Sequence, residues 1–362
     1  MYCCTNCLQD DHLRDLITNV GERGDCNYCE SEGIPIVEVT KLKSQFEPLL
    51  EEYSPVDDID LYQESDKDLS VGNITQQIND DWNNIFNTPD PDQLLKNILA
   101  DEAEVYESLF RNPVLLKLKY GKRNRERNIN RRNLWEKFQT EIKGKFRYFR
   151  VESSEIEEFE RLLKVLTVSI PQGTYLYRAR ISDKEGFSID KMGTPSPAKT
   201  SAGRANPQGI PYLYLSKDQR TTIYEVRAGL HDYVTVGEFQ ALKKLMVVNF
   251  RPVKEMSPFK VSSADLIDLI EYDSFIQGLM VDLSKPNRRF DSETDYIPTQ
   301  YVIEMVKKRG GIDGVEYPSS MDRSGRNIVL FETDKVRCIE SKTFAINDIK
   351  YYYKRINSSS ET

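Results

Sequence analysis

Two pairs of closely spaced cysteines near the N-terminus constrain the fold of this chain more tightly than any other feature. Cys4 and Cys7 form one pair and Cys26 and Cys29 the other, with two residues inside each pair and 18 between the pairs. A gap of two residues lets both thiolates of a pair turn toward one point. Four thiolates suit a tetrahedral Zn²⁺ ion with Zn–S distances of about 2.3 Å. The spacing therefore predicts a zinc knuckle, with a structural role because four cysteines leave no open coordination position.

Other uses of these cysteines are open at the level of the sequence. The pairs could be disulfides or redox-active thiols, although cytoplasmic proteins rarely keep disulfides. Cys3 could replace Cys4 as a ligand, and His12 could also ligate, although a lone surface histidine is the simpler interpretation. Cys338 stands alone in an apolar-flanked stretch and is expected to be an ordinary core or surface residue.

The composition describes a globular protein without a membrane span. The 362 residues are 39% hydrophobic and 30% charged, which suffices for two or three domains with buried cores. No apolar run approaches the roughly 20 residues that a membrane-spanning helix needs. The first residues also lack the basic and then apolar pattern of a signal peptide. We therefore expect a cytoplasmic protein with no membrane partner.

The charge of the chain is negative but unevenly distributed. A formal net charge of −8 argues against a protein that binds nucleic acid over its whole surface. Residues 51–110 are strongly acidic and residues 117–150 strongly basic, which favours a partner surface or mutual pairing of the two segments. The basic stretch 122–132 could bind RNA or a protein partner, although a solvated or paired face is the simpler interpretation.

The middle of the chain has the periodicity of helices. Apolar residues recur at intervals of three and four in the segments 73–88, 92–110 and 133–149. This pattern predicts a small helical domain. The chain then divides into a zinc-knuckle region, a helical domain and a C-terminal domain, at residues 1–40, 41–155 and 165–350.

Short apolar strands alternate with helices in the last of these domains, which gives the chain an α+β class. Strands are predicted at 174–180, 213–215, 234–236, 245–250, 314–317 and 327–331. Longer helices are predicted at 263–282 and 297–309. A short helix is expected to begin at a Ser216 cap completed by Gln219, and to carry Glu225.

Five residues of the C-terminal domain form a set with a common chemistry. They are two cations, an aromatic ring, a carboxylate and a hydroxyl: Arg178, Arg204, Tyr214, Glu225 and Ser319. Two arginines can grip a diphosphate through bidentate bonds. A carboxylate held rigidly by a helix can stabilise the cation that develops when a glycosidic bond breaks. Each residue alone is unremarkable, but together they predict a site that binds and cleaves a dinucleotide.

The order and context of this set resemble those of a RES domain, a family named for its Arg, Glu and Ser. The similar segments are 177–180, 203–206, 213–216, 222–226, 295–300, 311–315, 317–320 and 327–331. The part of the chain before them resembles the HEPN-like domain found ahead of some RES domains. Two features depart from the usual small RES protein, namely this N-terminal part and the long gap between Glu225 and Ser319.

The resemblance implies an ADP-ribosyltransferase-like fold with NAD as substrate rather than cofactor. RES proteins are bacterial toxins that deplete NAD by hydrolysis or phosphorolysis, and most are paired with a separate antitoxin. We therefore expect an NAD glycohydrolase or phosphorylase that acts as a toxin or antiviral defence effector. An antitoxin or regulatory protein is the expected partner, and homo-oligomerisation is open.

The expected roles follow from the chemistry of each side chain. Glu225 is the expected catalytic carboxylate, and Arg178 and Tyr214 act with it. The substrate-binding residues are then Arg178, Arg204, Tyr214, Ser319 and Asn327. Arg180 is expected in a supporting layer, and Gly203 and Gly209 are expected to permit the loop geometry near the ligand.

Two competing functions belong to other classes. Some relatives of RES proteins ADP-ribosylate a protein target, so the acceptor could be a macromolecule instead of water or phosphate. The chain could also be an adaptor that binds nucleic acid or a partner and has lost catalysis. The presence of all five residues argues against this last alternative.

Overall fold

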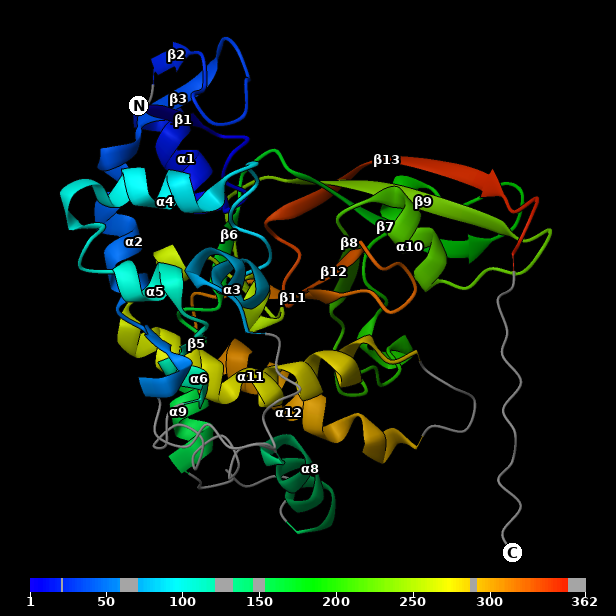
Figure 1. The fold of residues 1–362 in the computed structure, drawn as a ribbon. Helices are drawn as coiled ribbons and strands as arrows, with labels where there is room; N and C mark the ends of the chain where they lie inside the picture. Colours follow the sequence, from blue (N-terminus) through cyan, green and yellow to red (C-terminus); the bar gives the residue numbers. More distant parts are fainter. Residues whose placement is uncertain (21, 59–70, 121–132, 146–153, 287–291, 351–362) are drawn as a thin grey trace, which may run out of the picture. The chain divides into compact units, whose positions relative to one another are not determined.

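The structure, a computed structural model, describes all residues except 21, 59–70, 121–132, 146–153, 287–291 and 351–362 (Figure 1). Its internal contacts divide the chain into two compact units, Met1–Val165 with Arg251–Leu279 and Leu166–Phe250 with Met280–Thr362. The expected mixture of helices and strands is confirmed. None of the helices described is both long and apolar enough to cross a membrane. The basic stretch 122–132 lies outside the described residues.

The first unit begins with a small antiparallel sheet that carries the cysteine pairs. Its strands are β1 (Tyr2–Cys4), β2 (Glu22–Gly24) and β3 (Ile34–Glu38), in the order β1-β3-β2. The first cysteine pair starts at the end of β1, and the second follows β2. Because β3 pairs with both neighbouring strands, it brings the two cysteine pairs to the same end of the sheet.

Helices make up most of the rest of this unit. They are α1 (Asp11–Val20), α2 (Lys43–Leu50), α3 (Ile74–Asp81), α4 (Pro91–Leu99), α5 (Glu107–Arg111), α6 (Lys117–Tyr120), α8 (Leu134–Gly144), α9 (Ser154–Leu162) and most of α11 (Ser263–Ser284). The predicted segments 73–88 and 92–110 therefore contain shorter helices than their periodicity indicated. The sequence pattern also missed a two-stranded pair, β4 (Tyr53–Pro55) with β5 (Val114–Leu116).

Aromatic side chains join the later helices of the first unit. Phe275 on α11 lies with its ring centroid 5.2 Å from that of Trp135 on α8 and 4.6 Å from that of Phe159 on α9. Gly278, one turn further along α11, leaves room for Trp135, because a Cβ atom there would lie 2.5 Å from the indole ring. Segment 251–279 thus belongs to the core of the first unit although both of its neighbouring segments in the sequence belong to the second.

The second unit is built on an eight-stranded sheet in the order β13-β9-β7-β8-β12-β11-β10-β6. The strands are β6 (Thr167–Ile170), β7 (Tyr175–Ser182), β8 (Leu213–Ser216), β9 (Tyr233–Ala241), β10 (Leu245–Asn249), β11 (Gly314–Pro318), β12 (Arg326–Leu330) and β13 (Val336–Ala345). The six predicted strands are present in the structure. The two edge strands, β6 and β13, were not predicted.

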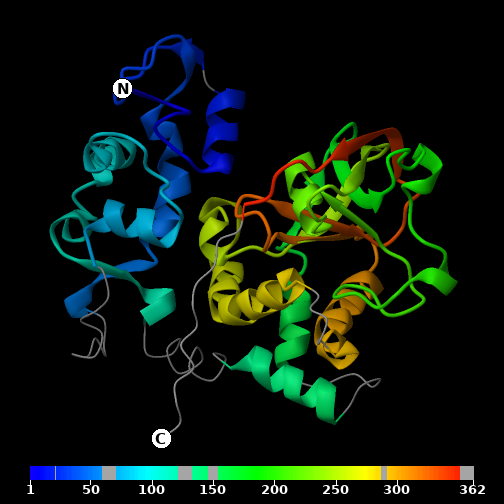
Figure 2. The same ribbon diagram turned by 90° about the vertical axis from the view of Figure 1, so that its right-hand side faces the viewer.

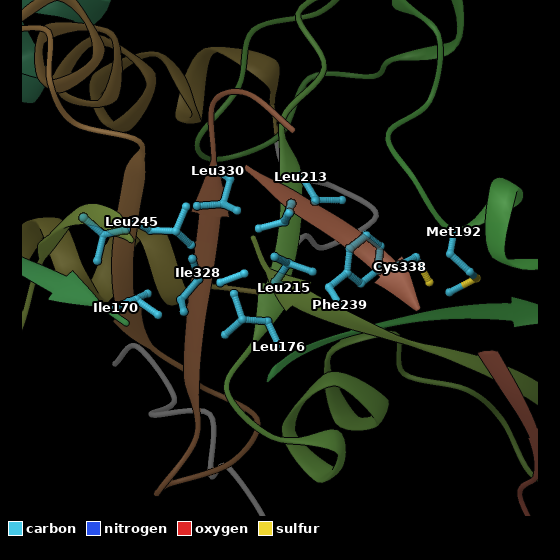
Figure 3. Packing of buried hydrophobic residues seen from close by; sticks show 13 residues of the cluster. Ile170, Leu176, Met192, Leu213, Leu215, Phe239, Leu245, Ile328, Leu330 and Cys338 are labelled. Carbon is cyan, nitrogen blue, oxygen red and sulfur yellow. The ribbon is translucent and has the colours of Figure 1, made fainter. Parts of the chain in front are cut away.

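One face of this sheet carries a continuous apolar core (Figure 3). Alternate residues of each contributing strand face it, such as Leu213 and Leu215 on β8 and Ile328 and Leu330 on β12. Side chains alternate between the faces of a strand. Tyr214 and Ser216 of β8 therefore point to the opposite face, as does Asn327 of β12. The hydrophobic core thus fixes which polar residues face the other side of the sheet.

Two helices of the second unit pack on its strands. The short helix α10 (Gln219–Glu225) contacts β7, β8, β9 and β12, and α12 (Ile297–Lys308) contacts β11. In both views α12, drawn in orange, lies below the strands of the sheet (Figure 2). The predicted cap of α10 was wrong. Asp218, not Ser216, accepts the hydrogen bond from the backbone N–H of Thr221 at 2.8 Å, because β8 continues through Ser216 before the helix begins.

Candidate active site

A row of polar side chains crosses the sheet of the second unit opposite its apolar core. Tyr177 on β7 is the register partner of Ser216 on β8, Ser216 is the partner of Asn327 on β12, and Asn327 is the partner of Tyr317 on β11. Register partners lie side by side on the same face. Sheet pairing therefore brings together residues that are far apart in the sequence.

Helix α10 lies at the point where strands β7 and β8 diverge. Strands β7 and β8 share the single register pair Tyr177–Ser216. Beyond it, the backbone N–H of Ala179 donates to the hydroxyl of Thr222 on α10, at 2.9 Å. A buried N–H needs such a partner where a strand has lost its neighbour. This bond fixes α10 against β7, and Glu225 is the last residue of the helix.

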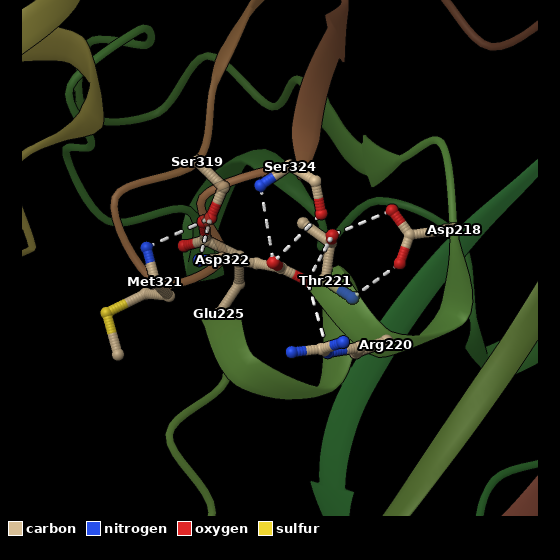
Figure 4. Close-up of polar contacts among 8 residues, drawn as sticks. All are labelled: Asp218, Arg220, Thr221, Glu225, Ser319, Met321, Asp322 and Ser324. Carbon is tan, nitrogen blue, oxygen red and sulfur yellow. Dashed lines mark hydrogen bonds and ion pairs between the residues drawn. The ribbon is translucent and has the colours of Figure 1, made fainter.

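The carboxylate of Glu225 is held through one of its two oxygens (Figure 4). Oε1 accepts a hydrogen bond from the Ser319 hydroxyl at 2.5 Å and another from Asn327 Nδ2 at 2.7 Å. Among the residues that the structure describes, none donates to Oε2. Glu225 also lines a cavity, so this second oxygen is available to a ligand.

Both donors to Glu225 are themselves oriented. The Ser319 hydroxyl oxygen accepts from the backbone N–H groups of Met321 and Asp322, each at 3.1 Å. Its single proton therefore points to Glu225. The side-chain oxygen of Asn327 accepts from the Ser216 hydroxyl at 2.9 Å, which turns its amide nitrogen toward Glu225. A chain of hydrogen bonds thus fixes the carboxylate before any ligand arrives.

The cavity beside Glu225 has a volume of about 490 Å³. Its lining includes Arg178, Arg204, Tyr214, Glu225, Tyr317 and Asn327. All lining residues belong to the second unit. Small-molecule and cofactor sites span about 300–1,000 Å³, so the cavity is large enough for a nucleotide-sized ligand.

The two predicted arginines lie in the cavity wall but in different environments. Arg178 donates through one Nη atom to the carbonyl of Gly193 at 3.0 Å. Burial, with a smaller contribution from the charge of nearby Arg180, lowers the pKa of Arg178 to about 10. Arg178 therefore stays cationic at neutral pH, and an anionic ligand would offset the cost of its burial. It offers the cavity a desolvated positive charge.

Arg204 is more fully engaged by the protein itself. Its Nε donates to the carbonyl of Lys285 at 2.7 Å, and its guanidinium lies 4.8 Å from the centre of the Tyr296 ring. Arg180 lies outside the cavity lining, with its guanidinium 4.1 Å from the centre of the Phe187 ring. Arg178 is thus the predicted arginine whose charge is best placed for a ligand.

Tyr214 is fixed by the loop that follows the other arginine. Its hydroxyl donates to Asn206 Oδ1 at 2.7 Å, and burial raises its pKa above the usual value. Gly203 allows this approach, because a Cβ atom there would lie 2.8 Å from the Tyr214 hydroxyl. Gln300 of α12 holds the same loop by donating to the carbonyls of Gly203 and Asn206, at 2.8 and 3.0 Å. Gly209, with a φ of +81°, supplies a left-handed turn in this loop.

The structure brings most of the predicted site residues together, but some of their contacts differ from those expected from the sequence. Ser319, expected to touch the ligand, is not part of the cavity lining, and its hydroxyl faces Glu225. Asn327 lines the cavity and also donates to Glu225. Sequence reasoning gave no role to Tyr317 or Asn206. The only sequence signal for them was their position inside the RES-like segments, because their placement depends on strand register and loop path.

The four predicted metal ligands form a compact group in the first unit. The Sγ atoms of Cys4, Cys7, Cys26 and Cys29 all lie within 4.8 Å of one another. Distances of 3.8 Å for Cys4–Cys7, 3.3 Å for Cys4–Cys29 and 3.5 Å for Cys7–Cys26 are close to the edge of a ZnS₄ tetrahedron, which is about 3.8 Å for Zn–S bonds of about 2.3 Å. The donor set therefore fits a zinc ion. Cys3 is not part of this group.

The two cysteine pairs have matching surroundings. In each pair the first Sγ accepts a backbone N–H from the residue two positions on: Asn6 donates to Cys4 and Tyr28 to Cys26, both at 3.4 Å. Such bonds favour thiolate ligands.

Both cysteine pairs are also bonded to a later segment of the first unit. The backbone N–H of Asn87 donates to the carbonyl of Cys7 at 2.8 Å, and the Thr88 hydroxyl donates to the carbonyl of Tyr28 at 3.1 Å. His12 bonds to Gln45 and is outside the group.

The second unit is thus a mixed α/β domain with a cavity that joins a fixed carboxylate to buried cations. Residues 175–351 match the family model of the RES domain, so the chain carries a C-terminal RES domain. No curated protein matches the chain. A chain from the crystal structure of the M.tuberculosis MbcT–MbcA toxin–antitoxin complex is similar at a TM-score of 0.30 and 12% identity, over 53% of this chain and 94% of that chain. A likeness this low supports no argument about either unit.

Proposed function

We propose that the RES domain consumes NAD by breaking the bond between nicotinamide and ribose. The observation that carries this proposal is the carboxylate of Glu225, which is fixed through Oε1 by Ser319 and Asn327 and belongs to a residue that lines a cavity of about 490 Å³. A carboxylate in this position can stabilise positive charge on a sugar ring. The RES match over residues 175–351 supports NAD as the substrate that supplies that ring.

The chemistry needs little beyond this carboxylate. As the C1′–N bond breaks, its electron pair leaves with nicotinamide, which departs as a neutral base, and the ribose takes on oxocarbenium character. Oε2 of Glu225 stabilises this charge and orients the acceptor. Water as acceptor gives ADP-ribose and releases one proton, whereas inorganic phosphate gives the phosphate ester of ADP-ribose. Because the carboxylate is fixed in advance, little reorganisation is required.

The cations of the cavity suit the other half of NAD. The diphosphate carries two negative charges, and the half-buried guanidinium of Arg178 in the cavity lining is positioned to meet them. Arg204 shapes the loop around Tyr214 and adds positive potential near its Lys285 contact. In this proposal Arg178 binds the diphosphate, Tyr214 and Tyr317 line the side nearest the ribose, and Glu225 acts at C1′.

The test is to incubate the purified full chain with NAD, with and without phosphate, and to identify the products by mass. We expect nicotinamide together with either ADP-ribose or its phosphate ester. Glu225→Gln should lower nicotinamide release by at least roughly a hundredfold. Glu332→Gln is a matched control, because Glu332 is 77% exposed and lies outside the cavity. Label transferred to a protein would indicate ADP-ribosylation instead. Intact NAD under every condition would contradict the proposal.

Loss of NAD would make such a domain toxic to the cell that contains it, which is the basis for proposing a toxin or defence role. A protein inhibitor is then the proposed partner. Growth arrest on expression of the full chain, absent with Glu225→Gln, is the expected result. Normal growth with the active protein present and NAD unchanged would contradict this role.

We also propose that the cysteine group of the first unit binds a structural zinc ion. All four ligands are supplied by cysteines whose sulfur atoms already approach the edges of a tetrahedron. When bound, zinc would stabilise the thiolates and hold the two pairs together. In this proposal the ion has a structural role, and no step at Glu225 is assigned to it.

A further inference from the structure

The loop between β11 and β12 contacts both ends of helix α10 (Figure 4). At the C-terminal end of the helix, Ser319 donates to Glu225. In the first turn, Asp322 Oδ2 lies 3.3 Å from the Thr221 hydroxyl, whose single proton it shares with Asp218 Oδ2 at 2.7 Å. Asp322 also pairs with Arg220 Nε at 3.4 Å. We call residues 319–325 the clasp loop. A single loop thus spans the seven-residue helix that carries the proposed catalytic carboxylate.

The contact between Asp322 and Thr221 is buried. Asp322 is 7% exposed and Thr221 is fully buried, so their contact is shielded from water. The Arg220 side chain is 69% exposed, and exposed ion pairs contribute little. The anchor is therefore the contact between Asp322 and Thr221, with Arg220 as a minor addition.

The clasp loop is closed on itself as well as on the helix. The other oxygen of Asp322, Oδ1, accepts from the Ser324 hydroxyl at 3.3 Å. The backbone N–H of Ser319 donates to the carbonyl of Gly325 at 2.9 Å, and that of Gly325 donates to the carbonyl of Asp322 at 3.0 Å. Movement of Asp322 would therefore be transmitted to Ser319.

The backbone of the clasp loop at Gly325 also packs closely against the first turn of α10. A Cβ atom on Gly325 would lie 2.3 Å from Thr221 Oγ1 and 2.7 Å from Thr221 Cγ2. Thr221 Oγ1 is itself held, because it donates to Asp218 at 2.7 Å. A side chain at position 325 would thus push the loop away from the first turn of α10.

We propose that Asp322 is a positioning residue for the reaction, acting through Ser319 on Glu225. Its side chain anchors the clasp loop to α10, and its backbone N–H is one of the two donors that turn the Ser319 proton toward Glu225. Asp322 is not in the cavity lining, so the inference gives it no contact with a ligand bound there. The catalytic part of this inference rests on the proposed function, and the loop geometry does not.

The test compares Asp322→Ala, Asp322→Asn and Asp218→Ala in the full chain. Asp218 caps the same helix and shares the Thr221 proton with Asp322, but within the described residues it makes no hydrogen bond to the clasp loop. Asp218→Ala therefore removes the cap and leaves the Thr221 proton to Asp322, so the clasp loop keeps its anchor. Asp322→Ala should lower kcat for nicotinamide release about tenfold with KM within about twofold, since a hydrogen bond to a charged group is weakened. Asp322→Asn keeps an acceptor oxygen and should recover most of kcat. Asp218→Ala should lower the melting temperature but leave kcat within about twofold.

Hydrogen exchange at the backbone amides of the clasp loop gives a second readout that needs no activity. Exchange there should be faster in Asp322→Ala than in Asp218→Ala, and Gly325→Ala should resemble Asp322→Ala. Equal loss of kcat in Asp322→Ala and Asp218→Ala, or unchanged exchange in the loop, would overturn the inference. A wild-type protein that never releases nicotinamide would contradict the proposed function. The hydrogen-exchange rates of the clasp loop would still decide whether Asp322 holds the loop.

Discussion

The cysteine group of the first unit and the Glu225 site of the second each bring a few side chains together, but these side chains come from very different separations along the sequence. The contacting cysteines are 3, 19 and 25 positions apart in the sequence. The two donors to Glu225 are 94 and 102 positions away from it. The cysteine group needs two local turns and one small sheet, whereas the Glu225 site needs the register of four strands and the placement of α10.

This difference determines how each part should fail. A metal site holds its own surroundings together, so loss of one ligand should affect stability first. The Glu225 site rests on an apolar core on the other face of the sheet. Changes to its side chains should therefore affect activity and leave the fold intact.

The largest effect is expected from Cys7→Ser, which removes one ligand of the proposed zinc site. Structural zinc contributes several kcal/mol or more to folding. We therefore expect loss of bound zinc and early unfolding of the first unit, measured by metal content and thermal melting. Cys3→Ala is the matched control, because Cys3 is equally buried but outside the group. Full zinc content in Cys7→Ser, or zinc loss in Cys3→Ala, would show that the ligand set is different.

Arg178→Ala should have an intermediate effect that is confined to activity. Loss of a half-buried cation facing a diphosphate should raise KM for NAD about tenfold or more, with an unchanged melting temperature to within a few degrees. Steady-state kinetics with Arg180→Ala as control tests this, because Arg180 is the neighbouring arginine outside the cavity lining. Equal effects of the two substitutions would mean that general positive potential, and not a specific contact, attracts the substrate.

The smallest effect is expected from Arg227→Gly. Arg227 follows α10 with a φ of +49°, in the left-handed region that glycine adopts without strain. The substitution should stabilise the backbone by about 1 kcal/mol, and loss of a cation in the cavity lining should raise KM by a few fold. Thermal melting and kinetics measure the two effects separately. Arg220→Gly, inside α10, should instead destabilise the protein. A lower melting temperature in Arg227→Gly would show that the contacts of its side chain outweigh the strain.

The same contrast explains what the sequence could predict. The cysteine group follows from spacing alone, and the core strands from runs such as 213–215 and 327–331. The edge strand β13 was missed because its exposed positions, such as Glu340 and Lys342, interrupt the apolar pattern. The cap of α10 was misplaced because both Ser216 and Asp218 are good capping residues, and only the extent of β8 decides between them.

The set of site residues was also easier to predict than their contacts. Arg178, Arg204, Tyr214, Glu225 and Asn327 all line the cavity. Spacing cannot show that Ser319 faces Glu225, because that contact depends on the path of the clasp loop over α10. Nor can it show that Arg204 donates to the carbonyl of Lys285, which is 81 positions away. Long-range pairings of this kind are set by register and loop path, which no local pattern encodes.

The central claim is that the cavity holds NAD with its scissile bond beside the open oxygen of Glu225. A crystal structure of Glu225→Gln with NAD tests this most directly, because the variant should bind the substrate without consuming it. The account predicts intact NAD in the cavity, with its diphosphate at Arg178 and C1′ of the nicotinamide ribose in contact with the side chain at position 225. NAD bound elsewhere, or with its nicotinamide ribose turned away from position 225, would contradict it.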